Sequence, residues 1–99
     1  LLYGGANVGL MNVLANRMLK HGARVIGIIP ASLVEVEVAH QQLSELKIVD
    51  TMHERKELLI DMADAFIMLP GSIGSLDEFF AVYTLNKLRY HSKPFAIIN

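Results

Sequence analysis

The sequence contains no cysteine, and this absence excludes disulfides and every metal site built on thiolates. None of its apolar runs approaches the roughly 18 residues of a membrane-spanning helix. Basic and acidic residues are nearly balanced, nine against ten, and they form no basic stripe of the kind that binds nucleic acid. We therefore expect a cytoplasmic protein with neither a nucleic-acid nor a membrane partner.

Two classes of catalytic site are also unsupported. The four histidines, at positions 21, 40, 53 and 91, form no pair four residues apart, so nothing indicates a metal site. No serine stands in the strand–turn–helix context of a nucleophile elbow. We expect no metal and no cofactor.

Apolar residues, in contrast, are abundant. They make up 53% of the 99 residues, so much of their surface must be buried, in a sheet covered on both faces or in a subunit interface. This length supports one domain, residues 1–99. The chain begins on Leu1-Leu2-Tyr3 and ends on a strand-like run from Phe95, and both ends indicate an incomplete fragment of a larger sheet.

Strand-like and helical stretches alternate along the chain. The patterns predict strands near 1–3, 24–29, 47–50, 65–69 and 94–98, and helices over about 10–19, 52–63 and 75–91. Right-handed crossovers would make the strands parallel. The prediction is an α/β fold, a Rossmann-like three-layer sandwich, with Gly22 as the residue that ends the first helix.

Residues 31–44 give a mixed signal. Valines alternate with Glu35 and Glu37, which favours a strand, whereas residues 39–43 favour a helix. We interpret the two glutamates as a solvated face rather than as catalytic groups. His40 is interpreted as a surface or loop histidine.

The most informative stretch is residues 65–80. An apolar strand ends at Pro70, a loop of small residues follows over 71–75, and a helix then opens with Asp77 and Glu78. Strand, glycine loop and helix N-terminus in this order make an anion site, because backbone N–H groups approach the ligand closely. Residues 4–9 form a second such loop, for which a purely structural turn stays an alternative.

The helix from Met52 opens with two cations. Arg55 and Lys56 lie in its first turn, where the helix dipole disfavours positive charge. A bound anion would explain their position, and merely solvated charges would explain it equally well.

Three segments resemble motifs of the LONELY GUY (LOG) family. Residues 70–78 resemble its Pro-Gly-Gly-x-Gly-Thr-x-x-Glu motif, with Ser72 and Ser75 as departures. Residues 4–12 resemble its Gly-Gly-Gly-x-x-Gly-Leu-Met-Gly motif, with Ala6 and Asn12 as departures. Residues 52–56 match its Met-His-Glu-Arg-Lys string in full.

The resemblance implies a cytokinin riboside 5′-monophosphate phosphoribohydrolase. Such an enzyme cleaves the N-glycosidic bond of an N6-modified adenosine 5′-monophosphate and releases the base and ribose 5-phosphate. The implied catalytic residues are Glu78 and Arg55. The implied substrate- and phosphate-binding residues are Gly71, Ser72, Ile73, Gly74, Ser75, Gly4, Gly5, Lys56 and Met52.

The family is also known as "possible lysine decarboxylases", and we reject that chemistry. Decarboxylation with pyridoxal phosphate needs a Schiff-base lysine and a large cofactor pocket. Lys56 is the only lysine in a suitable loop, and the chain is too short for such a fold.

Two alternatives to an enzyme stay open. One is a Rossmann-like module that binds a nucleotide or a nucleotide-bearing cofactor without catalysis, and the other is a dimerisation domain with a decayed site. Glu78 and Arg55 favour the enzyme, because a mere binder needs no carboxylate near the ribose. The predicted helix over 75–91 is apolar on more than one side, so we expect a homodimer that buries part of it.

Overall fold

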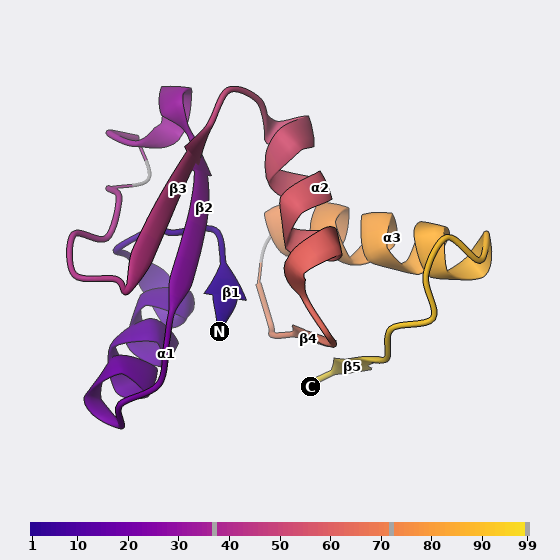
Figure 1. Ribbon diagram of the computed structural model, residues 1–99, viewed down its shortest axis with the longest axis horizontal. Helices are drawn as coiled ribbons and strands as arrows, with labels where there is room; N and C mark the ends of the chain where they lie inside the picture. The colour runs from indigo at the N-terminus through magenta and orange to yellow at the C-terminus, as the bar shows by residue number, and fades with distance from the viewer. Residues whose placement is uncertain (37, 72, 99) are drawn as a thin grey trace. The chain divides into compact units, whose positions relative to one another are not determined.

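The computed structural model describes residues 1–36, 38–71 and 73–98 (Figure 1). They form two compact units, Leu1–Asp61 and Met62–Asn99. In chain order the elements are β1 (Leu2–Tyr3), α1 (Gly9–Lys20), β2 (Ile26–Pro30), a 3₁₀ turn η1 (Ala31–Leu33), β3 (Glu45–Val49), α2 (Met52–Met62), β4 (Phe66–Met68), α3 (Ile73–Lys87) and β5 (Phe95–Ile97). This alternation confirms the predicted α/β fold.

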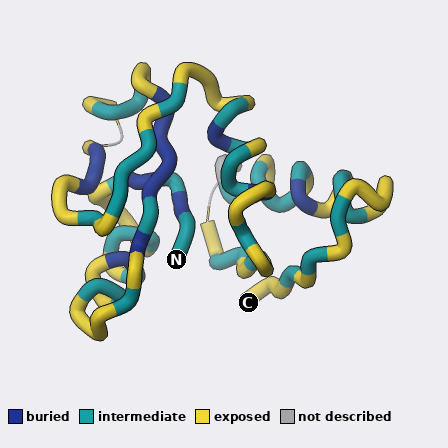
Figure 2. The backbone as a smooth tube through the Cα atoms, viewed as in Figure 1, coloured by how far each residue is buried: buried dark blue, intermediate teal, exposed yellow. Residues whose placement is uncertain are grey.

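The first unit contains a three-stranded parallel sheet in the order β1-β2-β3. The central strand β2 is the most buried, as Figure 2 shows, because it has a neighbouring strand on both sides. The largest fully buried side chains of the described residues are Ile28, Ile29, Val25 and Pro30. Burial of these side chains, in and next to the central strand, therefore stabilises the sheet.

Helix α1 packs on this sheet through one apolar face. Ala15 is fully buried and forms a cluster with Tyr3 and Val25, joined by the partly buried Leu1, Met11, Met18, Leu19 and Leu43. The helix ends as predicted, with Gly22 in the left-handed conformation at φ +80°. The Ala23 N–H donates to the Met18 carbonyl at 2.9 Å, which is the bond that closes a Schellman motif.

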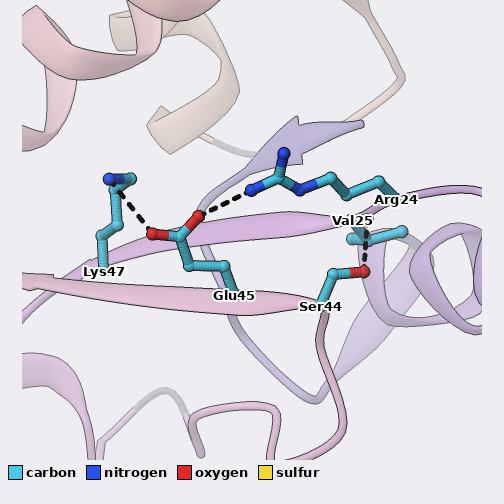
Figure 3. A network of polar contacts seen from close by, with 5 residues as sticks. All are labelled: Arg24, Val25, Ser44, Glu45 and Lys47. Atoms are coloured by element: carbon cyan, nitrogen blue, oxygen red, sulfur yellow. Dashed lines mark hydrogen bonds and ion pairs between the residues drawn. The ribbon is translucent and has the colours of Figure 1, made fainter.

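Polar side chains join the beginnings of β2 and β3 (Figure 3). The Ser44 hydroxyl oxygen accepts a hydrogen bond from the Val25 N–H at 3.0 Å. Glu45 forms ion pairs with Arg24 at 3.1 Å and with Lys47 at 3.2 Å. The Arg24 side chain is mostly exposed, so these pairs add little stability. β3 begins two residues before its predicted start.

In the second unit, β4 and β5 form a parallel ladder of their own, with Phe66 opposite Phe95. The ring of Phe95 contacts two aromatic side chains of α3, Phe79 at 5.8 Å and Tyr83 at 6.1 Å between centroids. These contacts hold the helix against the ladder. Both ladders are parallel, as predicted, and neither uses the mixed segment 31–44.

The segment 31–44 has a conformation that the sequence did not predict. It contains the turn η1 and an isolated antiparallel bridge between Ala39 and Ala6. Val36 is 76% exposed, so the valine alternation does not mark a buried strand. His40 lies outside the helices and strands, as a loop histidine would, but it is only 4% exposed and therefore is not a surface histidine. Segment 31–44 has this conformation because it contacts residues 5–7, which are far away in the sequence.

Candidate functional site

Residues 4–8, here called the glycine loop, connect the carboxyl end of β1 to α1. Gly5 has φ +79°, which favours glycine, and its Cα would lie 2.7 Å from a Cβ added at Gly27. Close packing of backbone on backbone therefore explains part of this glycine pattern. The Val8 side chain at the N-cap of α1 makes no capping hydrogen bond, and the first turn of α1 has no acidic residue. The helix start thus offers backbone N–H groups to an anion.

Helix α2 begins with a well-formed cap. The Glu54 N–H donates to the Thr51 hydroxyl oxygen at 3.1 Å, and the Glu54 carboxylate accepts from the Asp50 N–H at 3.0 Å. This carboxylate lies at the positive end of the helix, where negative charge is favourable. Glu54 therefore offsets the two cations that follow it.

Arg55 lies within the first unit and is only 8% exposed. Its guanidinium lies against the backbone of the glycine loop. A Cβ added at Gly4 would stand 2.9 Å from Nη2 and 3.2 Å from Cζ of Arg55. The structure thus brings together Gly4 and Arg55, two residues that the sequence predicted for one site. Positive charge, N–H donors and a backbone without side chains are the features of an anion-binding site.

The other two site residues predicted in this helix are Met52 and Lys56. Met52 is the first residue of α2 and is 40% exposed. Lys56 is partly buried. Both belong to the first five residues of the helix, which follows the carboxyl end of the parallel strand β3. In open α/β sheets this edge is where ligands bind.

The second predicted loop lies in the second unit. Gly71 packs against the Ser75 side chain so closely that a Cβ at Gly71 would collide with the Ser75 hydroxyl. Ile73 is the first residue of α3 and is largely exposed, and Gly74 belongs to the same first turn. Ser72 lies outside the described residues.

Glu78 is partly buried, and its neighbour Asp77 is exposed. The sequence pattern placed Glu78 in the first turn of its helix, and this detail was wrong. Helix α3 begins at Ile73, two residues earlier than predicted, so Glu78 lies in the second turn. The small residues at 74 and 75 indicate a loop, although they fit equally well into the first turn of a helix.

The side chains of His40 and Asn16 were not predicted to have a role near the glycine loop. His40 Nε2 lies 2.7 Å from Asn16 Oδ1, and His40 is far in sequence from the glycine loop that its backbone contacts. No local pattern could have revealed this contact. Among the described residues, no group of three His, Cys, Asp or Glu side chains could hold a metal ion. None of the helices that they form is long and apolar enough to cross a membrane.

Comparison with known proteins gives a consistent result. A family model described as "Possible lysine decarboxylase" matches residues 11–99. A cytokinin riboside 5′-monophosphate phosphoribohydrolase of Rhodococcoides fascians is 49% identical over 100 residues, which cover all of this chain and 50% of that protein. Proteins with the same activity name from Oryza sativa and Mycobacterium tuberculosis are 42% and 40% identical over 99 residues, covering all of this chain and 41% and 53% of those proteins.

The chain spans about half the length of the curated relatives it matches. The family match nevertheless includes the segments 52–56 and 70–78, which carry two of the three motifs. The chain belongs to the LONELY GUY (LOG) family of phosphoribohydrolases, the family described as "Possible lysine decarboxylase".

Proposed function

We propose that the intact protein hydrolyses the N-glycosidic bond of adenosine 5′-monophosphate or an N6-modified form of it. The products are the free base and ribose 5-phosphate. The observation that carries the proposal is the buried guanidinium of Arg55 against the backbone at Gly4, in a chain whose relatives bear this activity name. It supports an anion site at the carboxyl edge of a parallel sheet.

In this proposal the glycine loop and the start of α1 bind the 5′-phosphate, together with Gly71, Ser72, Ile73, Gly74 and Ser75. Met52 and Lys56 line the substrate site. Binding the phosphate through backbone N–H groups fixes the ribose and converts binding into orientation of the reacting bond. Arg55 makes a charge-assisted contact to the anionic substrate.

Glu78 acts on the ribose. Water adds to C1′ and loses a proton to the Glu78 carboxylate, the bond between C1′ and the base nitrogen breaks with its electron pair going to the base, and the base takes up a proton. The transition state resembles an oxocarbenium ion, which a nearby carboxylate stabilises while it helps to activate the water. This reaction needs neither a Schiff-base lysine nor a redox step. The lysine decarboxylase chemistry in the family description is not what these residues support.

Product analysis tests the proposal. The intact protein, incubated with AMP and with N6-isopentenyl AMP, should release adenine or its N6-substituted analogue together with ribose 5-phosphate. Glu78→Gln keeps the shape and removes the charge, so it should lower kcat by about 100-fold with a smaller effect on KM. Arg55→Ala should raise KM and lower kcat, because its contact to the anion already exists in the ground state.

The same experiment separates the enzyme from a non-catalytic nucleotide-binding module. A module of that kind would bind AMP without releasing a base, and Glu78→Gln would leave its AMP affinity unchanged. Base release by the wild-type protein that disappears in Glu78→Gln would contradict the module.

The protein also forms a homodimer through α3 in this proposal. The support is an apolar groove lined by Ile73, Leu76, Asp77 and Phe80, with Phe80 57% exposed although Phe79 and Tyr83 of the same helix pack on β5. A helix that is apolar on both sides buries the second side against a partner.

The cysteine-free sequence supports the further prediction of a cytoplasmic location, which cell fractionation would test.

A further inference from the structure

Residues 38–40, here called the clasp, hold the glycine loop from one side. The Asn7 N–H donates to the Val38 carbonyl at 2.7 Å, and the His40 N–H donates to the Gly5 carbonyl at 2.9 Å. Between these two bonds, Ala6 and Ala39 face each other in an antiparallel bridge. The clasp therefore fixes the backbone of the loop at the residues where the phosphate is proposed to bind.

The side chain of His40 joins the clasp to α1. Its Nδ1 accepts a hydrogen bond from the Gln42 N–H at 3.0 Å, so the proton of the neutral ring lies on Nε2. Nε2 then donates to Asn16 Oδ1 at 2.7 Å, and Asn16 Nδ2 donates to Asn12 Oδ1 at 3.1 Å. Both ring nitrogens of a nearly fully buried imidazole are thus used, which fixes its orientation.

The clasp also contains backbone strain. Val38 has φ +51°, a left-handed conformation that β-branched residues rarely adopt. Its carbonyl is the one that accepts from Asn7, so the strained residue is in direct contact with the glycine loop. Strain of this kind persists only where surrounding contacts impose it, and it occurs mostly at functional sites.

We infer that His40 is a positioning residue for the 5′-phosphate of the substrate. His40 belongs to the clasp, and its side chain connects the clasp to α1. It therefore fixes the position of the glycine loop relative to the first turn of α1. It does not touch the substrate. This inference rests on the proposed function, because it assigns the glycine loop the phosphate as its ligand.

Kinetics of the intact protein with AMP test the inference. His40→Ala should raise KM by about 10-fold and leave kcat within about 3-fold, because phosphate binding is weakened while Glu78 is unaffected. His40→Gln keeps an N–H donor for Asn16 and should recover part of this loss. His21→Gln, at the exposed end of α1, is the matched control and should behave as wild type.

Variants of Asn16 test the contact itself. Asn16→Asp keeps an oxygen acceptor for His40 but loses the donor to Asn12, so it should raise KM less than Asn16→Leu, which should resemble His40→Ala. If both residues act through their shared hydrogen bond, the double variant His40→Ala with Asn16→Leu is no worse than either single variant. Fully additive losses would overturn the inference.

Hydrogen exchange distinguishes positioning from a general structural role. In His40→Ala the amide of Asn7 should exchange at least about 10-fold faster, while the amide of Ile28 in the buried strand β2 stays protected. Equal acceleration at both amides would mean a general loss of stability and would overturn the inference. An unchanged KM in a folded His40→Ala protein would overturn it as well.

Different results would overturn the proposed function and the positioning role of His40. Calorimetric titration of AMP into Glu78→Gln, with and without His40→Ala, measures binding without turnover. Wild-type protein that neither binds nor hydrolyses AMP would overturn the proposed function and the positioning role together. Base release by the wild type, combined with equal AMP affinity in both titrations, would overturn the positioning role alone.

Discussion

Replacing Gly4 by alanine should disable the site without unfolding the protein. The added Cβ would stand 2.9 Å from Nη2 and 3.2 Å from Cζ of Arg55, whereas ordinary contacts of this kind begin at 3.4 Å. The guanidinium is the far end of a flexible side chain, so it can move away by about half an ångström or more at little cost. The collision therefore changes the position of Arg55 rather than the stability of the loop.

The expected magnitudes follow from this geometry. Gly4 does not have a positive φ, so alanine fits its backbone, and the reduced freedom of the unfolded chain offsets part of the local repacking. We expect the free energy of unfolding to change by less than about 1 kcal/mol. A catalytic group displaced by up to about 1 Å lowers kcat/KM by about 100-fold. Urea unfolding measures the first quantity, and base release from AMP measures the second.

Gly22→Ala is the matched control for this prediction. Apart from its chain neighbours, none of the described residues comes within 4 Å of a Cβ at Gly22, but its φ of +80° disfavours any side chain. This variant should lose about 1 kcal/mol of stability and keep its kcat/KM per folded molecule. A folded Gly4→Ala protein with wild-type kcat/KM would refute the argument that the position of Arg55 at the glycine loop matters for turnover.

Three further predictions concern stability and assembly. Burial raises the pKa of Tyr3, so its stabilising contribution is complete below pH ~10 and is lost as the pH rises through the raised folded-state value. Tyr3→Phe should therefore flatten the alkaline limb of a plot of stability against pH, and should cost about 1 kcal/mol at neutral pH because the hydrogen bond to the Ala6 carbonyl is lost. Arg89 has φ +65° at the end of α3, so Arg89→Gly should raise the free energy of unfolding by about 1 kcal/mol in urea titrations. Sedimentation of the intact protein at micromolar concentration should show a dimer that Phe80→Glu converts to a monomer, and a wild-type monomer would count against the proposed interface.

Features with local causes could be read from the sequence. Gly22 was predicted to end α1 because a left-handed residue after a helix is most often glycine, and the structure confirms it. Arg89 occupies the same position after α3, where the Tyr90 N–H donates to the Leu85 carbonyl at 2.9 Å. A sequence pattern based on glycine could not reveal this second motif, so the predicted helix extended to residue 91 instead of ending at Lys87.

Features that depend on contacts between residues far apart in the sequence could not be predicted from local patterns. The alternating valines over 34–38 have the period of a strand, but Val38 is instead held in a strained turn by its contact with Asn7. His40 lies next to two glutamines in the sequence, which indicates exposure, yet it is only 4% exposed and its ring contacts Asn16. Local periodicity records which face of an element is apolar, and it contains no information about which loop the element will meet.

The same contacts explain two departures from the family motifs. Ala6 replaces a glycine of the motif, but it lies in an antiparallel bridge with Ala39, an extended conformation that alanine adopts readily. Asn12 also replaces a glycine, and its side chain accepts the hydrogen bond from Asn16 that ends the chain of contacts starting at His40. Both departures therefore have a structural role in this protein. Gly4 and Gly5, where a side chain would displace Arg55 or strain the backbone, are kept. Within residues 4–12, glycine is retained where the geometry requires it and replaced where the fold has an alternative, which favours a working phosphate site over a decayed one.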